Sequence, residues 1–218
     1  MKETNIITVE QSSDYLVRFS EKMKLDKAVA LTVPRGYCAI AFIDGKATYR
    51  SGQCVCEKVY TRCGKEYLGR EIQFAFYPTV YLPEMTYGFG PINVNNGRLK
   101  EAYRVGINGR MSVSVTDYVA LINFFSFASE ITVEDVRQRV LPVVKSVGVP
   151  IVSSCFVDTN VSVFEIDSMI GEIRGKIKTG LEEEPTLLKM GIRVMSVEVN
   201  EIYVNEDDLE MIRNRINN

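Results

Sequence analysis

The sequence contains no histidine and has almost no net charge, and both deficits narrow the possible functions. Without histidine, the chain offers no Ser/His/Asp or Cys/His arrangement, so an enzyme would rely on carboxylates, lysine or a thiolate. The formal net charge is -2, so there is no overall basic field to recruit nucleic acid or an anionic membrane surface. Composition therefore gives no positive sign of a catalytic centre or a polyanionic partner.

Long hydrophobic runs and a secretory signal are also missing. The longest apolar runs, such as residues 119–122 and 147–152, are far shorter than the roughly 20 residues of a membrane-spanning helix. Residues 1–4 lead into no apolar segment of the kind that a signal peptide contains. We therefore expect a cytoplasmic protein with no transmembrane segment.

Cysteine is scarce, and its number is odd. Five cysteines argue against a disulfide framework, although Cys54, Cys56 and Cys63 lie within ten residues of one another. Structural zinc sites usually have four ligands and a tight Cys-x-x-Cys pair, and no histidine is present to complete a set. Reduced, buried thiols are the alternative. We predict no metal and no cofactor, and keep these three cysteines as a secondary metal candidate.

The residues that are present are those of an ordinary globular protein. Hydrophobic residues make up 46% of the 218 positions and charged residues 25%, enough for one large domain or two small ones. Residues 8–25 are predicted to form an amphipathic helix, because Tyr15, Leu16, Phe19 and Met23 recur at helical spacing.

From residue 28 the pattern is typical of strands. Turn signals at Asp44-Gly45 and at residues 95–97 predict hairpins, and Gly109 predicts a break between two strands. The predicted strands are residues 28–33, 37–43, 46–49, 53–60, 71–77, 86–89, 99–107 and 110–115.

Helical signals follow. Asp117 is predicted to cap a helix that runs to about residue 127, and Thr132 with Asp135 resembles a capping box for the next helix. Pro142 and residues 148–150 are expected to kink or split that second helix. An apolar stripe from Ile166 to Leu181 predicts a third helix, with Glu172 and Lys176 as an i, i+4 pair on its exposed side.

Residues 187–212 combine a helix end, a strand and a new helix. A strand is predicted over residues 192–204, with strict alternation placing Val194, Ser196 and Glu198 on one face and Val197 and Val199 on the other. Asn205 is predicted to cap the helix that follows. Strands before residue 115 and helices after residue 117, with one late strand, indicate the α+β class.

Four segments in this order resemble the SPFH or band 7 superfamily, which includes stomatins, prohibitins and flotillins, and most closely its soluble bacterial virion core protein-like branch. They are residues 31–37 (LTVPRGY), the DGK and SG hairpin at residues 44–52, residues 103–117 beginning YRVGING, and residues 191–205 as a closing strand. The resemblance implies an SPFH-like domain over residues 26–216, preceded by an N-terminal arm over residues 1–25.

The resemblance also implies a non-enzymatic scaffold. Relatives self-associate and organise other proteins, commonly at a membrane, so we expect a homo-oligomer with protein partners and, at most, peripheral contact with the inner face of the membrane. In relatives a membrane anchor often precedes the domain and a long coiled coil follows it; we expect neither here.

Two alternatives stay open. A ligand-binding module or enzyme would use the aromatic and polar segment 77–103, and a nucleic-acid-binding protein would use the basic first β region, where interleaved glutamates favour a solvated surface instead. The segment's residues of interest are Tyr81, Glu84, Tyr87, Phe89, Arg98 and Tyr103, and the basic residues are Arg35, Lys46, Arg50, Lys58, Arg62, Lys65 and Arg70.

Overall fold

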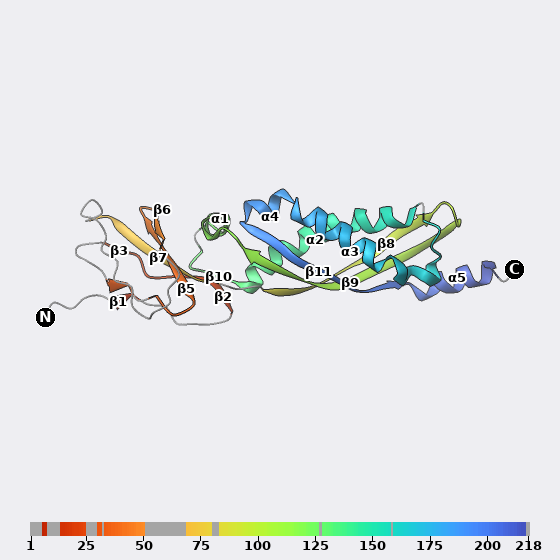
Figure 1. The fold of residues 1–218 in the computed structure, drawn as a ribbon, viewed down its shortest axis with the longest axis horizontal. Helices are drawn as coiled ribbons and strands as arrows, with labels where there is room; N and C mark the ends of the chain where they lie inside the picture. Colours follow the sequence, from red (N-terminus) through yellow and green to blue (C-terminus); the bar gives the residue numbers. More distant parts are fainter. Residues whose placement is uncertain are drawn as a thin grey trace. The chain divides into compact units, whose positions relative to one another are not determined.

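The computed structural model describes residues 6–7, 14–24, 30–31, 33–50, 69–79, 83–126, 128–157 and 159–216 (Figure 1). They form two compact units: residues 1–81 with 117–136, here unit 1, and residues 82–116 with 137–218, here unit 2. The fold class is α+β, with mostly antiparallel strands first, helices after them and a late strand, as predicted.

Unit 1 is built on a mostly antiparallel sheet. Its strand order is β10 (Glu130–Thr132), β2 (Tyr15–Phe19), β7 (Glu71–Pro78), β5 (Tyr37–Ile43) and β6 (Lys46–Arg50), with β3 (Met23–Lys24) also on β7; β1 (Ile6–Ile7) pairs separately with β4 (Ala30–Leu31). The predicted strand 37–43 is confirmed to the residue. Asp44 and Gly45 both have positive φ, the conformation that a two-residue hairpin turn requires.

The predicted N-terminal helix is wrong. Residues 15–19 form strand β2, which pairs with β7 and β10, and residues 23–24 form β3. The neighbours Leu16 and Val17 are both fully buried, which a strand allows when both of its faces are covered. Spacing of three and four positions among apolar residues fits such a doubly buried strand as well as a helix. Residues 15–19 and 23–24 therefore belong to the sheet of unit 1.

The core of unit 1 lies on both faces of its central strands. On one face, alternate residues of β5 and β7 pack together with Val33, while Met23 and Tyr37 lie against them. Toward the other, Tyr118 of helix α1 (Tyr118–Phe124) stacks on Tyr77 with ring centres 4.0 Å apart. Asp117 caps α1 as predicted, its carboxylate accepting from the N–H groups of residues 119 and 120.

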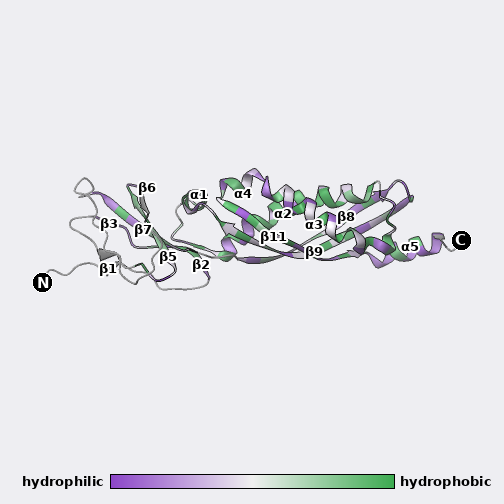
Figure 2. Cartoon of the chain, viewed as in Figure 1, coloured by the Kyte–Doolittle hydropathy of each residue, from purple (hydrophilic) through white to green (hydrophobic). Residues whose placement is uncertain are grey.

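Unit 2 is a three-stranded antiparallel sheet with most of its helices on one face, and its last helix lies at one end of the sheet (Figure 1). The strand order is β11 (Ile192–Val204), β9 (Glu101–Val115) and β8 (Glu84–Asn96). The helical segments are α2 (Val133–Val157) from residue 137 onward, η2 (Val163–Met169), α3 (Ile170–Glu182), α4 (Pro185–Lys189) and α5 (Glu206–Ile216). Figure 2 shows hydrophobic and hydrophilic positions alternating round α2 and α3, as expected for helices with one buried face.

Helix α2 is not split by its prolines. The capping box is present, since Thr132 Oγ1 accepts from the Asp135 N–H and the Asp135 carboxylate accepts from the Thr132 N–H. The helix then continues through Pro142 and Pro150. Both prolines are exposed, so the carbonyl groups four residues earlier face the solvent side of the helix.

The short apolar runs of the sequence predict no segment long enough to span a membrane. Because α2 is continuous, this prediction needs correction. Among the helices that the structure describes, α2 alone is long and apolar enough, by length and composition, to cross a membrane. A third of its most apolar 18-residue window is buried inside the protein, and the core helix of a soluble protein meets the same criterion.

Strand β9 is unbroken, so the predicted break at Gly109 is wrong. A Cβ at Gly109 would overlap the carbonyl oxygen of Glu198 and lie 2.6 Å from the Tyr87 hydroxyl oxygen. Glycine is required here by close packing across the sheet rather than by a turn.

Strand β11 has the predicted bounds, but its side chains do not alternate strictly. Its register with β9 shifts between Val194 and Ser196 and again between Val199 and Glu201. Each extra residue reverses the alternation, so five apolar residues reach the same buried face: Ile192, Val194, Val197, Val199 and Ile202. The predicted two-faced strand is therefore wrong.

Candidate functional site

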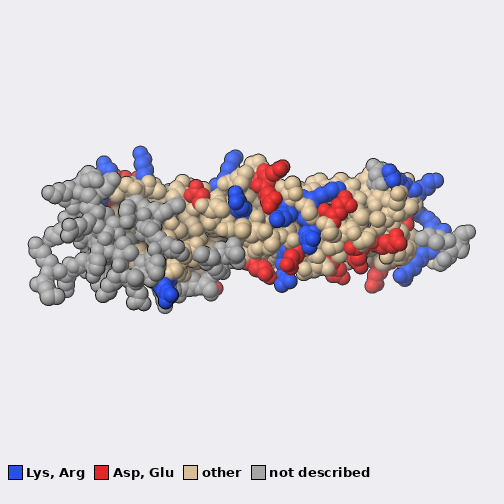
Figure 3. Space-filling view, viewed as in Figure 1, with Lys and Arg blue, Asp and Glu red and all other residues tan. Residues whose placement is uncertain are grey.

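The face of the unit 2 sheet that turns away from the buried residues carries a row of polar side chains. At its centre Arg110 of β9 reaches both outer strands: Nη1 lies 3.4 Å from Glu84 Oε1 on β8, and Nη2 lies 3.1 Å from Glu198 Oε2 on β11. Figure 3 shows acidic and basic side chains interspersed on the visible surface of this unit. All three side chains are about half exposed, so each pair contributes little to stability.

The row continues along the same face, which we call the open face. Ser112 and Ser196 share a hydrogen bond of 2.6 Å, and the Asn108 amide donates to Glu201 at 3.0 Å. The ring of Tyr203 lies against Gly106, where any Cβ would overlap it. The open face is thus an ordered polar surface with one half-exposed aromatic ring.

Behind the open face, Tyr87 ties the three strands together. It starts on β8, crosses β9 at Gly109, and its hydroxyl donates to the Glu198 carbonyl of β11 at 2.8 Å. Burial and then the Glu198 carboxylate raise the pKa of Tyr87 to about 12, so the phenol stays protonated and remains a donor. This contact holds the backbone of the open face at the position where Arg110 bridges the strands.

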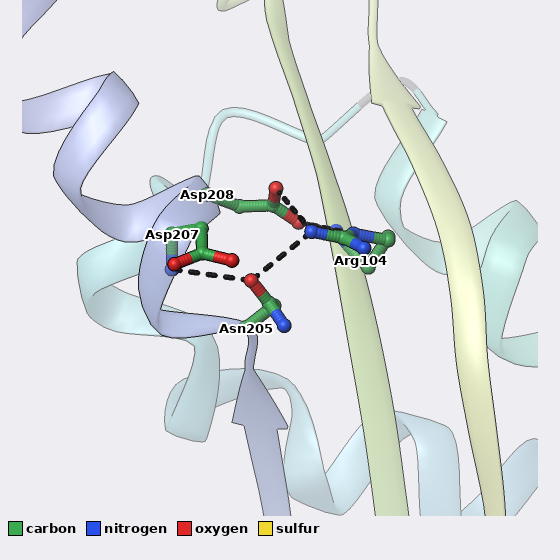
Figure 4. Close-up of polar contacts among 4 residues, drawn as sticks. All are labelled: Arg104, Asn205, Asp207 and Asp208. Atoms are coloured by element: carbon green, nitrogen blue, oxygen red, sulfur yellow. Dashed lines mark hydrogen bonds and ion pairs between the residues drawn. The ribbon is translucent and has the colours of Figure 1, made fainter.

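At one end of the sheet, Arg104 of β9 holds the start of α5 (Figure 4). Its Nε and Nη2 donate to the Asp208 carboxylate at 2.9 and 3.0 Å, and its backbone N–H donates to the same group at 2.8 Å. Nη2 also donates to Asn205 Oδ1 at 3.1 Å. We call these three residues the α5 clasp.

Charge assistance in the clasp is strong because Asp208 is only 4% exposed. The hydrogen bond from Arg104 lowers the pKa of Asp208 despite the opposing effect of burial, and the same bond raises the pKa of Arg104. Both groups therefore stay ionised across the whole neutral range. Asn205 caps α5 as predicted, its side-chain oxygen accepting from the Asp207 N–H.

Two hollows accompany these features. One, of about 330 Å³, adjoins the clasp in unit 2 and is lined by Asn93, Val94, Asn95, Ala102, Tyr103, Arg104 and Asp208. The other, of about 570 Å³, lies in unit 1 and is lined by Lys22, Phe42, Gly45, Glu71, Gln73, Ser126 and Ser129. In the second, Lys22 and Glu71 already form an ion pair of 3.1 Å. In the first, the ionisable residues Arg104 and Asp208 are likewise paired with each other.

The predicted cysteine cluster cannot be placed, since Cys54, Cys56 and Cys63 lie outside the described residues, as does the predicted strand 53–60. Cys38 and Cys155 are buried, reduced thiols. Lys176 Nζ lies 3.6 Å from Cys155 Sγ and 2.6 Å from Glu172, which forms the predicted i, i+4 pair. Burial raises the pKa of Cys155. Within the described ranges, no three His, Cys, Asp or Glu residues come together as metal ligands.

The described aromatic residues of segment 77–103 lie in the core. Tyr77 packs in unit 1, while Tyr87, Phe89 and Tyr103 face the helices of unit 2. Tyr81 lies outside the described residues. Glu84 belongs to the open face, and Arg98 donates to Asn160 at 3.3 Å. The segment therefore does not bring its aromatic and ionisable side chains together in one pocket.

The basic residues of the first β region are described in part. Arg35, Lys46 and Arg70 are exposed, and Arg70 lies 3.6 Å from the carboxylate of Asp44. Lys58, Arg62 and Lys65 lie outside the described residues, and for Arg50 only the backbone is described.

The sequence pattern did not predict the α5 clasp. Asp208 is one of three acids at the start of α5, and the pattern alone suggested only a favourable interaction with the helix N-terminus. Its partner lies 104 positions earlier in the chain. Arg104 and Asp208 could have been placed together only by knowing which residues of β9 and β11 pair with each other.

Neither a scan against models of protein families nor a search of curated proteins finds a match for this chain.

Proposed function

We propose that the protein is a non-enzymatic scaffold of the SPFH type that self-associates and binds protein partners, with peripheral contact to a membrane surface. The proposal rests first on the ordered resemblance of the four sequence segments. The structural observation that carries it is the outer edge of β11: this 13-residue strand pairs with β9 on one side, and no described strand pairs with its other side.

The edge has features of a contact surface. Met195 and Tyr203 on β11 are large apolar side chains and about half exposed. The two bulges interrupt the regular spacing of backbone donors and acceptors, which discourages indiscriminate strand addition. We therefore expect copies of the protein to associate through side-chain contacts at this edge rather than through backbone pairing. Specific interfaces likewise combine aromatic and methionine contacts with a polar rim.

The test is the mass of the purified protein in solution over a wide concentration range, measured by light scattering with cross-linking at cellular concentration. We expect a homo-oligomer, and we expect Met195→Lys to weaken it. Leu188→Lys is the matched control, since Leu188 is an exposed apolar residue on α4. A strict monomer that also ignores anionic vesicles and other proteins would contradict the scaffold.

A further inference from the structure

Helix α5 carries an exposed stripe that nothing in the described chain covers. Asp207, Met211 and Arg215 lie at i, i+4 and i+8, so they share one side of the helix, and all three are exposed. The side next to this stripe is buried, with Asp208 in the clasp and Ile212 only 4% exposed. Met211 is 54% exposed, so this helix presents an apolar side chain away from its own core.

The charges along the stripe have opposite signs at its two ends. The first turn of α5 is acidic and the last turn is basic. Asp208 is used by Arg104, and Arg213 lies over the Phe164 ring at 5.6 Å. By contrast, the side chains of Asp207 and Arg215 form no hydrogen bond or ion pair with any described residue. Asp207 is attracted to Arg104 through space, but the stripe ends in two charges that have no direct partner among the described residues.

This pattern is complementary to itself. Asp207 and Arg215 are equidistant from Met211, about 6 Å along the helix axis on either side. Two copies of α5 placed antiparallel about a two-fold axis through Met211 would set each Asp207 against the Arg215 of the other copy. The two methionines would meet at the axis. A parallel arrangement would instead place like charges together, which is unfavourable.

We propose that the exposed stripe of α5 binds the same stripe of a second copy of this chain in an antiparallel, two-fold symmetric contact. The inference deepens the proposed self-association and rests on it, because it adds a second contact between copies, through α5, to the one proposed at the edge of β11. The clasp supports the contact: it fixes the first turn of α5 to β9, so less orientational freedom is lost when two helices meet.

The test begins with Met211→Glu, measured by sedimentation equilibrium of the full chain. Since the substitution acts twice in a two-fold contact, we expect the dissociation constant to rise about a hundredfold, or about 2.7 kcal/mol. Leu188→Glu makes the same chemical change on α4 and should leave the constant unchanged. Circular dichroism of each variant verifies that the fold is intact.

Charge reversal tests the pairing itself. Asp207→Arg alone and Arg215→Asp alone should each weaken association at least tenfold, because like charges then face each other in both symmetric positions. An equimolar mixture of the two variants should associate again, and so should the double variant. A mixture of the double variant with the unchanged protein should not form mixed dimers, whereas parallel helices would favour them.

The outcomes separate this inference from the proposed function. If the unchanged protein is an oligomer and the α5 variants leave it intact, the scaffold stands and the α5 contact is wrong. If the unchanged protein is a monomer at every concentration, both fail. Loss in the single variants without recovery in their mixture would also overturn the antiparallel pairing.

Discussion

The two units use antiparallel strands in different ways. In unit 1, six of the seven residues of β5 are buried, and neighbours such as Ile40 and Ala41 face opposite sides of a sheet that is covered on both. In unit 2, β8 alternates between buried and exposed residues because helices cover one face and the other is wet. A strand covered on both faces disfavours unpaired polar side chains, whereas the open face of unit 2 can carry a pattern of charges for contacts.

The largest loss of stability is expected from two single substitutions that each place a carboxylate in the core, at neighbouring positions of one strand. In β5, both Ile40→Asp and Ala41→Asp should destabilise unit 1 by about 4 kcal/mol or more, because each buries an unpaired charge. In β11, Val197→Asp should be similarly severe, but Glu198→Ala should be mild. Hydrogen exchange resolved by segment measures this for each unit. If either position accepted aspartate with little loss of stability, β5 would not be covered on both faces and the comparison would fail.

Gly109→Ala should have the next largest effect. The added Cβ would overlap the Glu198 carbonyl and crowd Tyr87, so we expect a loss of about 2–3 kcal/mol in urea unfolding. Gly97→Ala is the control, since a Cβ at Gly97 meets nothing within 4 Å. A neutral Gly109→Ala would show that the three-strand contact through Tyr87 does not constrain the sheet.

Asp208→Asn should release α5 without unfolding the sheet, because it removes the charge that Arg104 binds while keeping the side-chain size. We expect faster hydrogen exchange in α5 and little change in β8. Asp207→Asn, which leaves the clasp intact, is the control. If both variants exchange alike, the clasp does not hold the helix.

The clasp also predicts a pH dependence. The folded-state pKa of Asp208 is lowered, so its stabilisation is complete above the unfolded pKa of about 3.9 and is lost as pH falls through the folded value. Protection of α5 should therefore be flat at neutral pH and decline below about pH 4. Asp208→Asn should remove that decline.

The smallest effect is expected on the open face. Arg110→Met should change the free energy of unfolding by less than about 1 kcal/mol, because both of its ion pairs are half exposed. Repeating the measurement at high salt should leave the variant unchanged and weaken the native protein slightly. A loss as large as that of Gly109→Ala would mean that the open face is structural rather than available for contacts.

Local signals in the sequence predicted many elements correctly. Asp117, the pair of Thr132 with Asp135, and Asn205 cap helices where expected, because capping depends on residues three positions apart at most. Strands 37–43 and 192–204 were predicted to the residue because long β-branched or apolar runs have clear ends. The Asp44-Gly45 turn followed from the same local chemistry.

The errors arose where a distant segment decides the outcome. Residues 15–19 are a strand because β7 and β10 pair with them, and helical spacing could not reveal those partners. Pro142 and Pro150 stay within one helix because they face solvent. The faces of β11 could have been read from the sequence, since its buried residues are spaced by two, three, two and three positions, a spacing that two bulges explain.

The sequence by itself determined the class of the fold, the helix caps, the turns and the extents of the main strands, since these depend on nearby residues. Only the tertiary structure showed that the Tyr87 side chain crosses β9 at Gly109 to reach the backbone of β11. It also showed that Arg104 binds Asp208. Those contacts join residues about a hundred positions apart, and strand register, which no local pattern specifies, brings them together. The acidic start of α5 was visible from the beginning; only the structure separated the aspartate that holds the helix from the one that stays exposed.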